Sequence, residues 1–186
     1  MRLAAISKYI DLLLKWNARI NLTAIRAPEE IVQRHFGESL FAAQHILAQR
    51  LVKTAIDLGS GAGFPGVPFA LLAPEVEVTL IESSQKKSTF LRELIYLLGL
   101  RNVKVFSGRA ESYSQSADLV MLRAVEKFGE VLPLALSLVS RNGRLALLIG
   151  TSQVELAKSL LPGVKWQEVL AIPSGHSRVL LVGTKW

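Results

Sequence analysis

One stretch of the sequence combines a carboxylate with closely spaced glycines. The apolar segment 55–58 carries Asp57 and is followed by four glycines in eight residues, Gly59, Gly61, Gly63 and Gly66. Glycine adopts positive φ readily and allows another molecule to approach the backbone. An apolar run that can form a helix follows at 67–72. A strand, a glycine-rich turn and a helix in this order predict a small-molecule site at the carboxyl end of a parallel strand.

Two kinds of ligand fit such a loop, and the first is a dinucleotide. Residues 61–66 match the spacing G-x-G-x-x-G, and Glu82 lies about twenty residues further on, where a ribose-binding acid is expected. Two features disfavour a pyrophosphate. Pro65 removes one N–H donor from the start of the helix, and Asp57 would place a negative charge beside the phosphates. An NAD(P)-dependent oxidoreductase is therefore the alternative interpretation.

The second ligand is S-adenosylmethionine, which carries an ammonium and a sulfonium and has no phosphate. Asp57 and the backbone of residues 59–63, which includes Gly59 and Gly61, suit its methionine end. Glu82, at the end of the second predicted strand, can accept both ribose hydroxyls. Residues 108–111, after the third predicted strand, lie where the adenine is expected. Because one crevice accommodates all three parts of this cofactor, we predict S-adenosylmethionine.

The composition narrows the class of protein. With 186 residues, half of them hydrophobic, the chain can bury one full core, and a single domain spanning 1–186 is the simplest interpretation. It contains no cysteine, which excludes disulfides, thiolate catalysis and zinc–cysteine sites. No apolar run reaches transmembrane length and no cleavage signal is evident, so we expect a soluble intracellular protein. The net charge of +7 favours a polyanionic partner, although the basic residues are scattered.

The first fifty residues are predicted to be helical. An amphipathic pattern over 3–14 indicates a first helix. Pro28, followed by two glutamates, marks the start of a second helix, because proline suits the first turn and acids suit the positive end of the helix dipole. Gly37 is the only turn signal between this helix, expected to end near Phe36, and a third at 38–50. These helices form an extension packed on the remainder of the chain.

The core, residues 51–186, alternates between strands and helices. Such alternation is typical of a mostly parallel sheet. Strands are expected at 55–58, 77–81, 103–107, 119–122, 144–149, 168–172 and 179–183, and helices at 66–72, 86–98, 128–139 and 153–160. The loop between the last two strands is too short for a helical crossover, so these strands must pair antiparallel. The predicted fold is α/β and Rossmann-like, with a seven-stranded, mostly parallel sheet, an antiparallel C-terminal hairpin and preceding N-terminal helices.

Several motifs occur in the order found in one known family. They are Trp16-Asn17, Asn21-Leu22-Thr23, Arg34-His35, Ser39-Leu40, the loop 57–66 with its Phe-Pro-Gly ending, Lys86-Lys87, Phe90-Leu91, the segment 108–111 and Arg123-Ala124. With these motifs the chain resembles the small-subunit ribosomal RNA methyltransferase G family, also called the glucose-inhibited division protein B family. The resemblance covers nearly the whole chain, and the combination is specific where each motif alone is not.

Members of that family are bacterial cytoplasmic enzymes with a class I S-adenosylmethionine-dependent methyltransferase fold. The resemblance implies methylation of N7 of one guanine in 16S ribosomal RNA, with that RNA or the small ribosomal subunit as partner, and a monomer. We expect no metal and no membrane contact. The resemblance implies that five residues contact the cofactor: Gly59, Phe64, Ala110, Glu111 and Arg123. The residue chemistry adds three more: Asp57, Gly61 and Glu82.

Three departures from the family pattern concern mainly the RNA side. Ile149 precedes Gly150 where the family often has a lysine, and His176-Ser177-Arg178 replaces the usual Glu-Arg-His. The chain also begins close to the Trp-Asn signature. Loss of the lysine removes a candidate phosphate or base contact. A catalytically inactive RNA-binding relative is therefore a further alternative.

No catalytic residue is assigned, because guanine N7 has a free lone pair and its methylation requires no proton removal. The protein's task is then positioning and desolvation. Three residues are candidates for substrate binding: Arg34 and His35 on the predicted helical extension, and Arg123 at the end of the fourth strand, which can bind guanine O6 or a phosphate. The alternatives are a solvated Arg34, a His35 that packs helices, and an Arg123 paired with Asp118 or Glu126.

Overall fold

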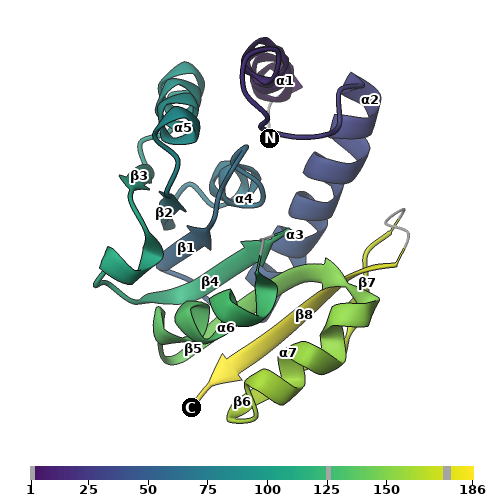
Figure 1. Ribbon diagram of the computed structural model, residues 1–186, viewed down its shortest axis with the longest axis vertical. Coiled ribbons are helices and arrows are strands. Elements are labelled where there is room, and N and C mark those ends of the chain that lie inside the picture. The colour runs from purple at the N-terminus through teal and green to yellow at the C-terminus, as the bar shows by residue number, and fades with distance from the viewer. Residues whose placement is uncertain (1–2, 125–126, 174–176) are drawn as a thin grey trace.

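The computed structural model describes residues 3–124, 127–173 and 177–186. It contains one sheet with helices on both faces (Figure 1). The strands follow the order β3-β2-β1-β4-β5-β8-β6, and the short β7 pairs with β8. Their bounds are β1 Thr54–Leu58, β2 Glu77–Glu82, β3 Val103–Ser107, β4 Ala117–Arg123, β5 Val139–Gly150, β6 Val164–Trp166, β7 Leu170–Ala171 and β8 Arg178–Lys185.

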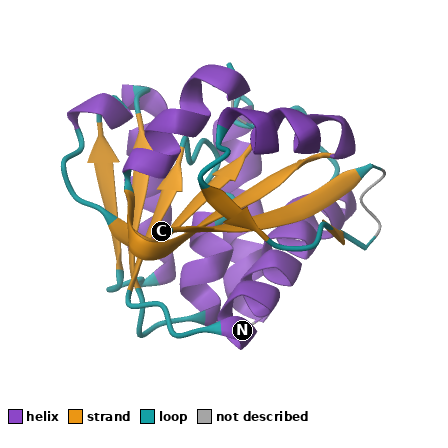
Figure 2. Cartoon of the chain, turned by 90° about the horizontal axis from the view of Figure 1, so that it is seen from below, coloured by secondary structure: helices purple, strands orange, loops and turns teal. Residues whose placement is uncertain are grey.

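The first five strands form the parallel part of the sheet. Strand β1 lies between β2 and β4, and β3 and β5 flank these two. The last four residues of β1 are buried, as a strand covered by helices on both faces requires. Figure 2 shows these strands side by side between the two layers of helices. The order of the strands reverses between β1 and β4, and an open α/β sheet binds ligands at the carboxyl ends of its strands at such a point.

The helices divide between the two faces of the sheet. One face is covered by α1 (Leu3–Asn17), α3 (Glu38–Gln49), α4 (Gly66–Leu72) and α5 (Gln85–Leu98), and the other by α6 (Phe128–Ser137) and α7 (Val154–Leu160). Local signals define both ends of α5. The Ser84 side chain accepts a hydrogen bond from the Lys87 N–H at its start, and Gly99 ends it in the left-handed conformation.

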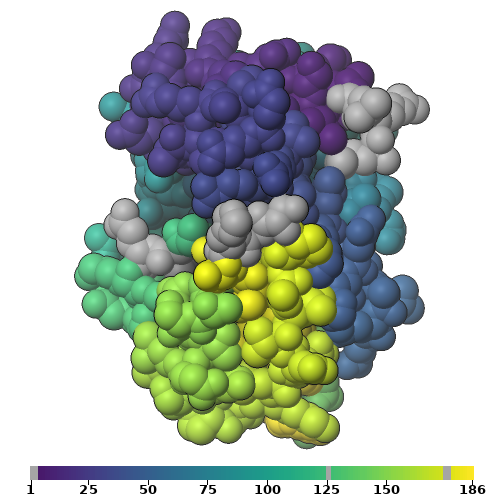
Figure 3. Space-filling view, turned by 90° about the vertical axis from the view of Figure 1, so that its right-hand side faces the viewer, coloured from purple at the N-terminus to yellow at the C-terminus, as the bar shows by residue number. Residues whose placement is uncertain are grey.

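The N-terminal helices belong to the same hydrophobic core as one face of the sheet. Tyr9 and Ile46 are buried in one cluster with Leu80 of β2 and Phe90 of α5. In the view of Figure 3, these helices form one end of the molecule, and α7 and β8 form the other. Their packing brings the N-terminal segment over the carboxyl ends of the strands.

The segment from Pro28 to Gln49 forms one continuous helical run, and the predicted break at Gly37 is wrong. It comprises α2 (Pro28–Glu30), a π-helical stretch (Ile31–Gly37) and α3. Gly37 has helical dihedral angles, φ −55° and ψ −53°. Glycine lowers helix propensity by only about 1 kcal/mol. Burial of the neighbouring Phe36 and of Ile46 offsets that cost.

The C-terminal part confirms the predicted fold class and corrects one strand. As predicted, the last two strands, β7 and β8, pair antiparallel, and β8 also lies antiparallel between β5 and β6. The expected strand at 168–172 is replaced by two short strands, so the sheet has eight strands instead of seven. Trp166 explains the difference. Its ring packs where Gly183 of β8 has no side chain, which places 164–166 in register with β8 before the chain reaches β7.

Candidate functional site

A cavity of about 870 Å³ lies at the carboxyl ends of β1, β2 and β4. One side is formed by the glycine loop after β1 and by the ends of β2 and β3. The other is formed by residues 22–24, which we call the strap, together with the end of β4 and the start of α6. Eight of the ten predicted site residues line it: Gly59, Gly61, Phe64, Glu82, Ala110, Glu111, His35 and Arg123.

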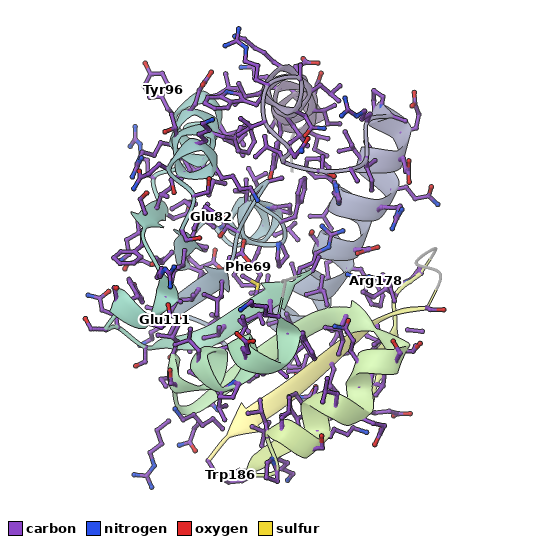
Figure 4. The ribbon with its side chains drawn as sticks, in the orientation of Figure 1. Phe69, Glu82, Tyr96, Glu111, Arg178 and Trp186 are labelled. Carbon is purple, nitrogen blue, oxygen red and sulfur yellow. The ribbon has the colours of Figure 1, made fainter. Side chains whose placement is uncertain are left out.

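Glu82 organises the cofactor side of the cavity. Its Oε2 accepts a hydrogen bond from the Gly61 N–H at 2.9 Å, and its Oε1 accepts one from the Ser84 N–H at 2.8 Å. Its carbonyl accepts the Gly108 N–H at 3.0 Å. In Figure 4, Glu82 lies inside the molecule and Glu111 lies nearer its edge. Glu82 therefore joins the glycine loop to the segment after β3 and still faces the cavity.

The glycine loop uses most of its own N–H groups internally. The N–H groups of Gly59 and Ser60 donate to the Ile81 carbonyl at 3.0 and 3.1 Å, and Gly63 donates to the Ser60 carbonyl at 2.7 Å. With Gly61 bound to Glu82, four donors of the loop are engaged. A pyrophosphate would need such donors. The loop therefore suits a ligand that needs few hydrogen bonds from backbone N–H groups.

Asp57 lies behind the loop and outside the cavity wall, so the structure does not place it in direct contact with a ligand there. Its Oδ2 accepts the Gly66 N–H at 3.0 Å, and its Oδ1 is buried without a hydrogen-bond partner among the described residues. Burial raises the pKa of Asp57 to about 7, and the Gly66 N–H counteracts part of this rise. A Cβ at Gly66 would collide with the carboxylate. In this structure Asp57 contacts the loop backbone, and its contact with an ammonium stays a prediction.

Arg123 joins β4 to the N-terminal helices. Its Nε and Nη2 donate to Oε2 of Glu38 at 3.2 and 3.0 Å, and Nη2 also donates to the Arg34 carbonyl at 3.2 Å. Burial lowers the pKa of Arg123, and the Glu38 carboxylate opposes that effect. The hydrogen bonds of the described chain do not use Nη1. Arg123 is thus anchored by one side of its guanidinium while it lines the cavity.

Among the described residues, the ion-pair partner of Arg123 is Glu38, and the alternative pair with Asp118 is not formed. Asp118 instead accepts the N–H groups of Lys53 and Thr54 at the start of β1, at 2.9 and 3.2 Å. Glu126 lies outside the described residues. Glu38 is 85 residues away from Arg123 in the chain, which is why spacing did not reveal the pair.

His35 is held neutral between two partners. Nη2 of Arg123 lies 2.9 Å from its Nδ1, and because a guanidinium only donates, Nδ1 must accept. Nε2 then carries the proton and donates to Oγ1 of Thr23 at 2.7 Å. Burial, together with the charges of Arg123 and Arg34, lowers the pKa of His35 to about 3. Both ring nitrogens are occupied, so His35 is not a general base.

Arg34, by contrast, points away from the cavity. It forms an ion pair with Glu30 at 3.0 Å, and about half of its side chain is exposed. The pair lies one turn apart on the outer surface of the helix. As placed, Arg34 fits the alternative of a solvated arginine better than a residue of the cavity wall.

Asn17 has a structural role in the site that was not predicted from the sequence. Its Nδ2 donates to the Thr23 carbonyl at 2.9 Å, and its Oδ1 accepts the N–H groups of Leu22 and Thr23 at 2.9 and 3.1 Å. These three bonds hold the strap against the end of α1. The motifs Trp16-Asn17 and Asn21-Leu22-Thr23 were the available signal, and their six-residue spacing corresponds to this loop.

Comparison with known proteins identifies the family. The family described as "rRNA small subunit methyltransferase G" (GidB) matches residues 2–172. The chain belongs to this family. The predicted family is therefore confirmed, together with its class, an S-adenosylmethionine-dependent methyltransferase. An NAD(P)-dependent oxidoreductase is excluded as an interpretation.

Individual relatives agree with this assignment. "Ribosomal RNA small subunit methyltransferase G" of Chromobacterium violaceum is 37% identical over 169 residues, covering 90% of this chain and 79% of the relative. The protein of the same name from Nitrosomonas europaea is 45% identical over 119 residues, covering 63% of this chain and 54% of the relative. The crystal structure of M. jannaschii TYW2 in complex with AdoMet has a TM-score of 0.64 at 18% identity, covering 90% of this chain and 78% of that one. The last likeness concerns the fold.

The cavity of this methyltransferase G family member fits the methyl donor of its class. Its volume lies within the roughly 300–1,000 Å³ usual for small-molecule sites. Glu82 would hold the ribose, and Ala110 and Glu111 lie where the adenine is expected. Within the described part of the chain, no cluster of three or more histidines and carboxylates is arranged to hold a metal ion. Within the same residues, none of the helices has the length and apolar composition that crossing a bilayer requires.

The structure describes the surroundings of two residues that depart from the family pattern, Ile149 and Arg178. Ile149 is buried in the core beside β8, so its side chain lies away from the solvent. Arg178 donates from Nη2 to the Leu148 carbonyl at 3.0 Å, and its Nε lies 3.7 Å from Glu38. Residue 176 lies outside the described residues. Arg178 thus adds a second positive charge to the buried Glu38 carboxylate.

Proposed function

We propose that this chain methylates N7 of a guanine in 16S ribosomal RNA with S-adenosylmethionine as the methyl donor. The observation that carries the proposal is the two-sided cavity. One wall consists of the glycine loop and Glu82, which suit the cofactor. The other wall is formed by the strap, His35 and Arg123 and is left for the acceptor base. Relatives in the family bear the name of a ribosomal RNA methyltransferase.

When bound, S-adenosylmethionine supplies a methyl group that its sulfonium already activates. Guanine N7 attacks with its own lone pair, so the chain needs no residue that removes a proton. The neutral His35, with both nitrogens engaged, agrees with this mechanism. The work of the protein is to align the two reactants and exclude water. For this reason no catalytic residue is assigned.

Arg123 is the candidate for orienting the base. Its anchoring by Glu38 and His35 leaves Nη1 as the donor group not used within the described chain. A guanidinium beside N7 would oppose the positive charge that methylation places on the base. A contact with O6 or with a phosphate avoids this repulsion. Arg123 therefore binds the acceptor on the O6 side or through its backbone.

Cations at the rim of the cavity suit an RNA backbone. Lys87, Arg109 and Lys127 all line the opening, and the chain carries a net charge of +7. Phosphate contacts position a nucleic acid without reading its sequence.

The proposal includes a cytoplasmic protein that acts as a monomer, with 1–186 as one domain. The core shared by the N-terminal helices and the sheet supports the single domain.

The test uses the chain with methyl-labelled S-adenosylmethionine and 16S ribosomal RNA, supplied both as a naked transcript and within the small subunit. We expect label in one form of the RNA at a single guanine. Chemical cleavage at 7-methylguanine should then map the label to N7. Cofactor binding without label in either form would overturn the proposal and favour an inactive RNA-binding relative.

A further inference from the structure

Tyr9 of α1 contacts the glycine loop, as Glu82 does. Its side chain is fully buried, and its hydroxyl donates a hydrogen bond to the Ala62 carbonyl, 53 residues away in the chain. Burial raises the pKa of Tyr9 well above its usual value, so the phenol remains a donor. Ala62 itself lines the cavity. A residue of the N-terminal helix thus holds the backbone of the cofactor wall.

The ring of Tyr9 makes a second contact with the same loop. It stacks on Phe64 with the centroids 5.0 Å apart and the planes within 7° of parallel. Phe36 and His35 pack on Phe64 from other directions, at centroid distances of 5.1 and 4.8 Å. Phe64 also lines the cavity. Aromatic pairs in such geometries stabilise each other beyond the effect of the area that they bury.

The space between these two contacts is filled by Gly63. A Cβ at this position would collide with the Tyr9 hydroxyl, and the φ of Gly63 is +91°. The loop is therefore shaped to receive the tyrosine. Two other groups hold the loop from within the core: Glu82 binds the Gly61 N–H and Asp57 binds the Gly66 N–H. Tyr9 is the third, and it comes from the N-terminal helix.

We propose that Tyr9 is a positioning residue for the cofactor: from α1 it holds the Ala62 carbonyl and the Phe64 ring, and it thereby sets the affinity of the loop for S-adenosylmethionine. This inference rests on the proposed function only in taking S-adenosylmethionine as the ligand. It makes the N-terminal helices part of the cofactor site as well as of the acceptor wall. The tyrosine does not touch the reacting atoms.

The physical effect is pre-organisation. A loop already held in its binding conformation loses less conformational freedom when the ligand arrives. Removal of the hydroxyl leaves the Ala62 carbonyl without its donor while the aromatic stack remains. A neutral hydrogen bond contributes roughly 0.5–1.5 kcal/mol, which corresponds to about a 2- to 12-fold change in an equilibrium constant.

The test is Tyr9→Phe in the full chain, with S-adenosylmethionine binding measured by calorimetry in the absence of RNA. We expect the Kd to rise roughly 2- to 12-fold. In turnover assays the KM for S-adenosylmethionine should rise by a similar factor, whereas kcat and the KM for RNA should stay within twofold. A purely structural role would lower stability without this selective change in the cofactor constants.

The matched control is Tyr113→Phe. The Tyr113 hydroxyl lies within hydrogen-bond distance of Oε1 of Gln115 at 3.1 Å and of Oγ1 of Thr79 at 3.3 Å, but Tyr113 does not line the cavity. Its Kd for S-adenosylmethionine should equal that of the unchanged protein. Equal affinities for the Tyr9 variant and the control would overturn the inference. Absence of cofactor binding by the unchanged protein would instead contradict the proposed function.

Hydrogen exchange on the unchanged protein gives a second measurement that does not depend on the variant folding. Because coupling between two sites is reciprocal, a cofactor that binds the held loop must also stabilise the docking of α1. Addition of S-adenosylmethionine should therefore slow amide exchange around Tyr9 as well as in the loop 59–63. Slower exchange in the loop alone would contradict the coupling.

Discussion

The two walls of the cavity differ in how their contacts are distributed along the chain. On the cofactor side, Glu82 holds residues 21 and 2 positions away, Gly61 and Ser84. On the acceptor side, Arg123 reaches Glu38 and His35 across 85 and 88 residues. The first wall is assembled by neighbouring strands and the loops that leave them. The second exists only when the N-terminal helices have docked on the sheet.

The comparison predicts that substitutions in the two walls have different effects. Substitutions in the cofactor wall should weaken the binding of the methyl donor and leave the fold largely intact. Changes in the acceptor wall should first reduce stability or RNA binding, because its polar residues also hold the N-terminal helices in place. The two walls meet at Phe64 of the cofactor loop, because both His35 and Tyr9 stack on its ring.

The largest effect is expected from Arg123→Ala. It leaves the Glu38 carboxylate, 2% exposed, without its closest cation among the described residues, and Arg178 remains at 3.7 Å. Removal of one partner of a buried ion pair typically costs about 3–5 kcal/mol. Urea unfolding should show a loss of that order. The control is Lys158→Ala, which breaks the surface pair with Glu155 and should cost at most about 1 kcal/mol. Equal losses of unfolding free energy in the two variants would contradict a stabilising buried pair between Arg123 and Glu38.

Glu82→Ala should act on the other wall. It removes the carboxylate that accepts the N–H groups of Gly61 in the glycine loop and of Ser84 after β2, and one hydrogen bond to a charged group contributes about 1.5–3 kcal/mol. We expect calorimetry to show S-adenosylmethionine binding weakened at least 10-fold, with the Kd for RNA unchanged. Glu77→Ala, at the exposed start of the same strand, is the control. Loss of RNA binding together with cofactor binding would show that the walls are not separable.

The pH dependence of stability should distinguish the two buried titratable residues of the site. Asp57 has a folded-state pKa of about 7 against an ordinary value of 3.8, so the folded state binds the extra proton between these values. Its contribution to the free energy of unfolding is therefore lost as the pH rises from about 4 to 7. Asp57→Asn removes this dependence, and the difference between variant and unchanged protein should change by at most about 1.4 kcal/mol per pH unit.

His35 should produce the opposite slope. Its folded-state pKa of about 3 lies below the ordinary 6.5, so the unfolded state binds the proton between these values and stability rises with pH over that window. Between about pH 4 and 6.5 the two residues partly cancel in the unchanged protein. In Asp57→Asn the rise due to His35 should become visible in urea unfolding measured at half-unit intervals. Parallel curves for the variant and the unchanged protein would contradict the assigned shift of Asp57.

The smallest effect is expected from Thr23→Val, which keeps the shape of the strap residue. It removes the hydroxyl that pairs with His35 and accepts the Ile25 N–H at 3.1 Å. A loss of about 1 kcal/mol in positioning should raise the KM for RNA several-fold while the Kd for S-adenosylmethionine stays constant. Thr89→Val, on the exposed side of α5, is the control. A change in the Kd for S-adenosylmethionine with an unchanged KM for RNA would contradict the assignment of the strap to the acceptor wall.

The sequence was sufficient for the fold class and for most of the cofactor wall. The alternation of apolar runs and helical patterns predicted the order of strands and helices, and parallel strands must bring their carboxyl ends to one edge. The loop 59–66 and Glu82 therefore reach the cavity by short-range geometry alone. The carboxylate at 57 and the proline at 65 also separated the two candidate ligands.

Only the tertiary structure decided which way the polar side chains turn. Asp57 shares a strand with cavity-facing residues, yet its carboxylate lies behind the loop because Gly66 leaves room for it there. Arg123, predicted to face a substrate or the surface, is anchored by Glu38, and Arg34, a candidate for substrate binding, pairs with Glu30. Gly37 lies within a continuous helix. Periodicity and spacing describe contacts within an element and between adjacent strands. The contacts of the N-terminal helices depend on long-range packing, which no local pattern encodes.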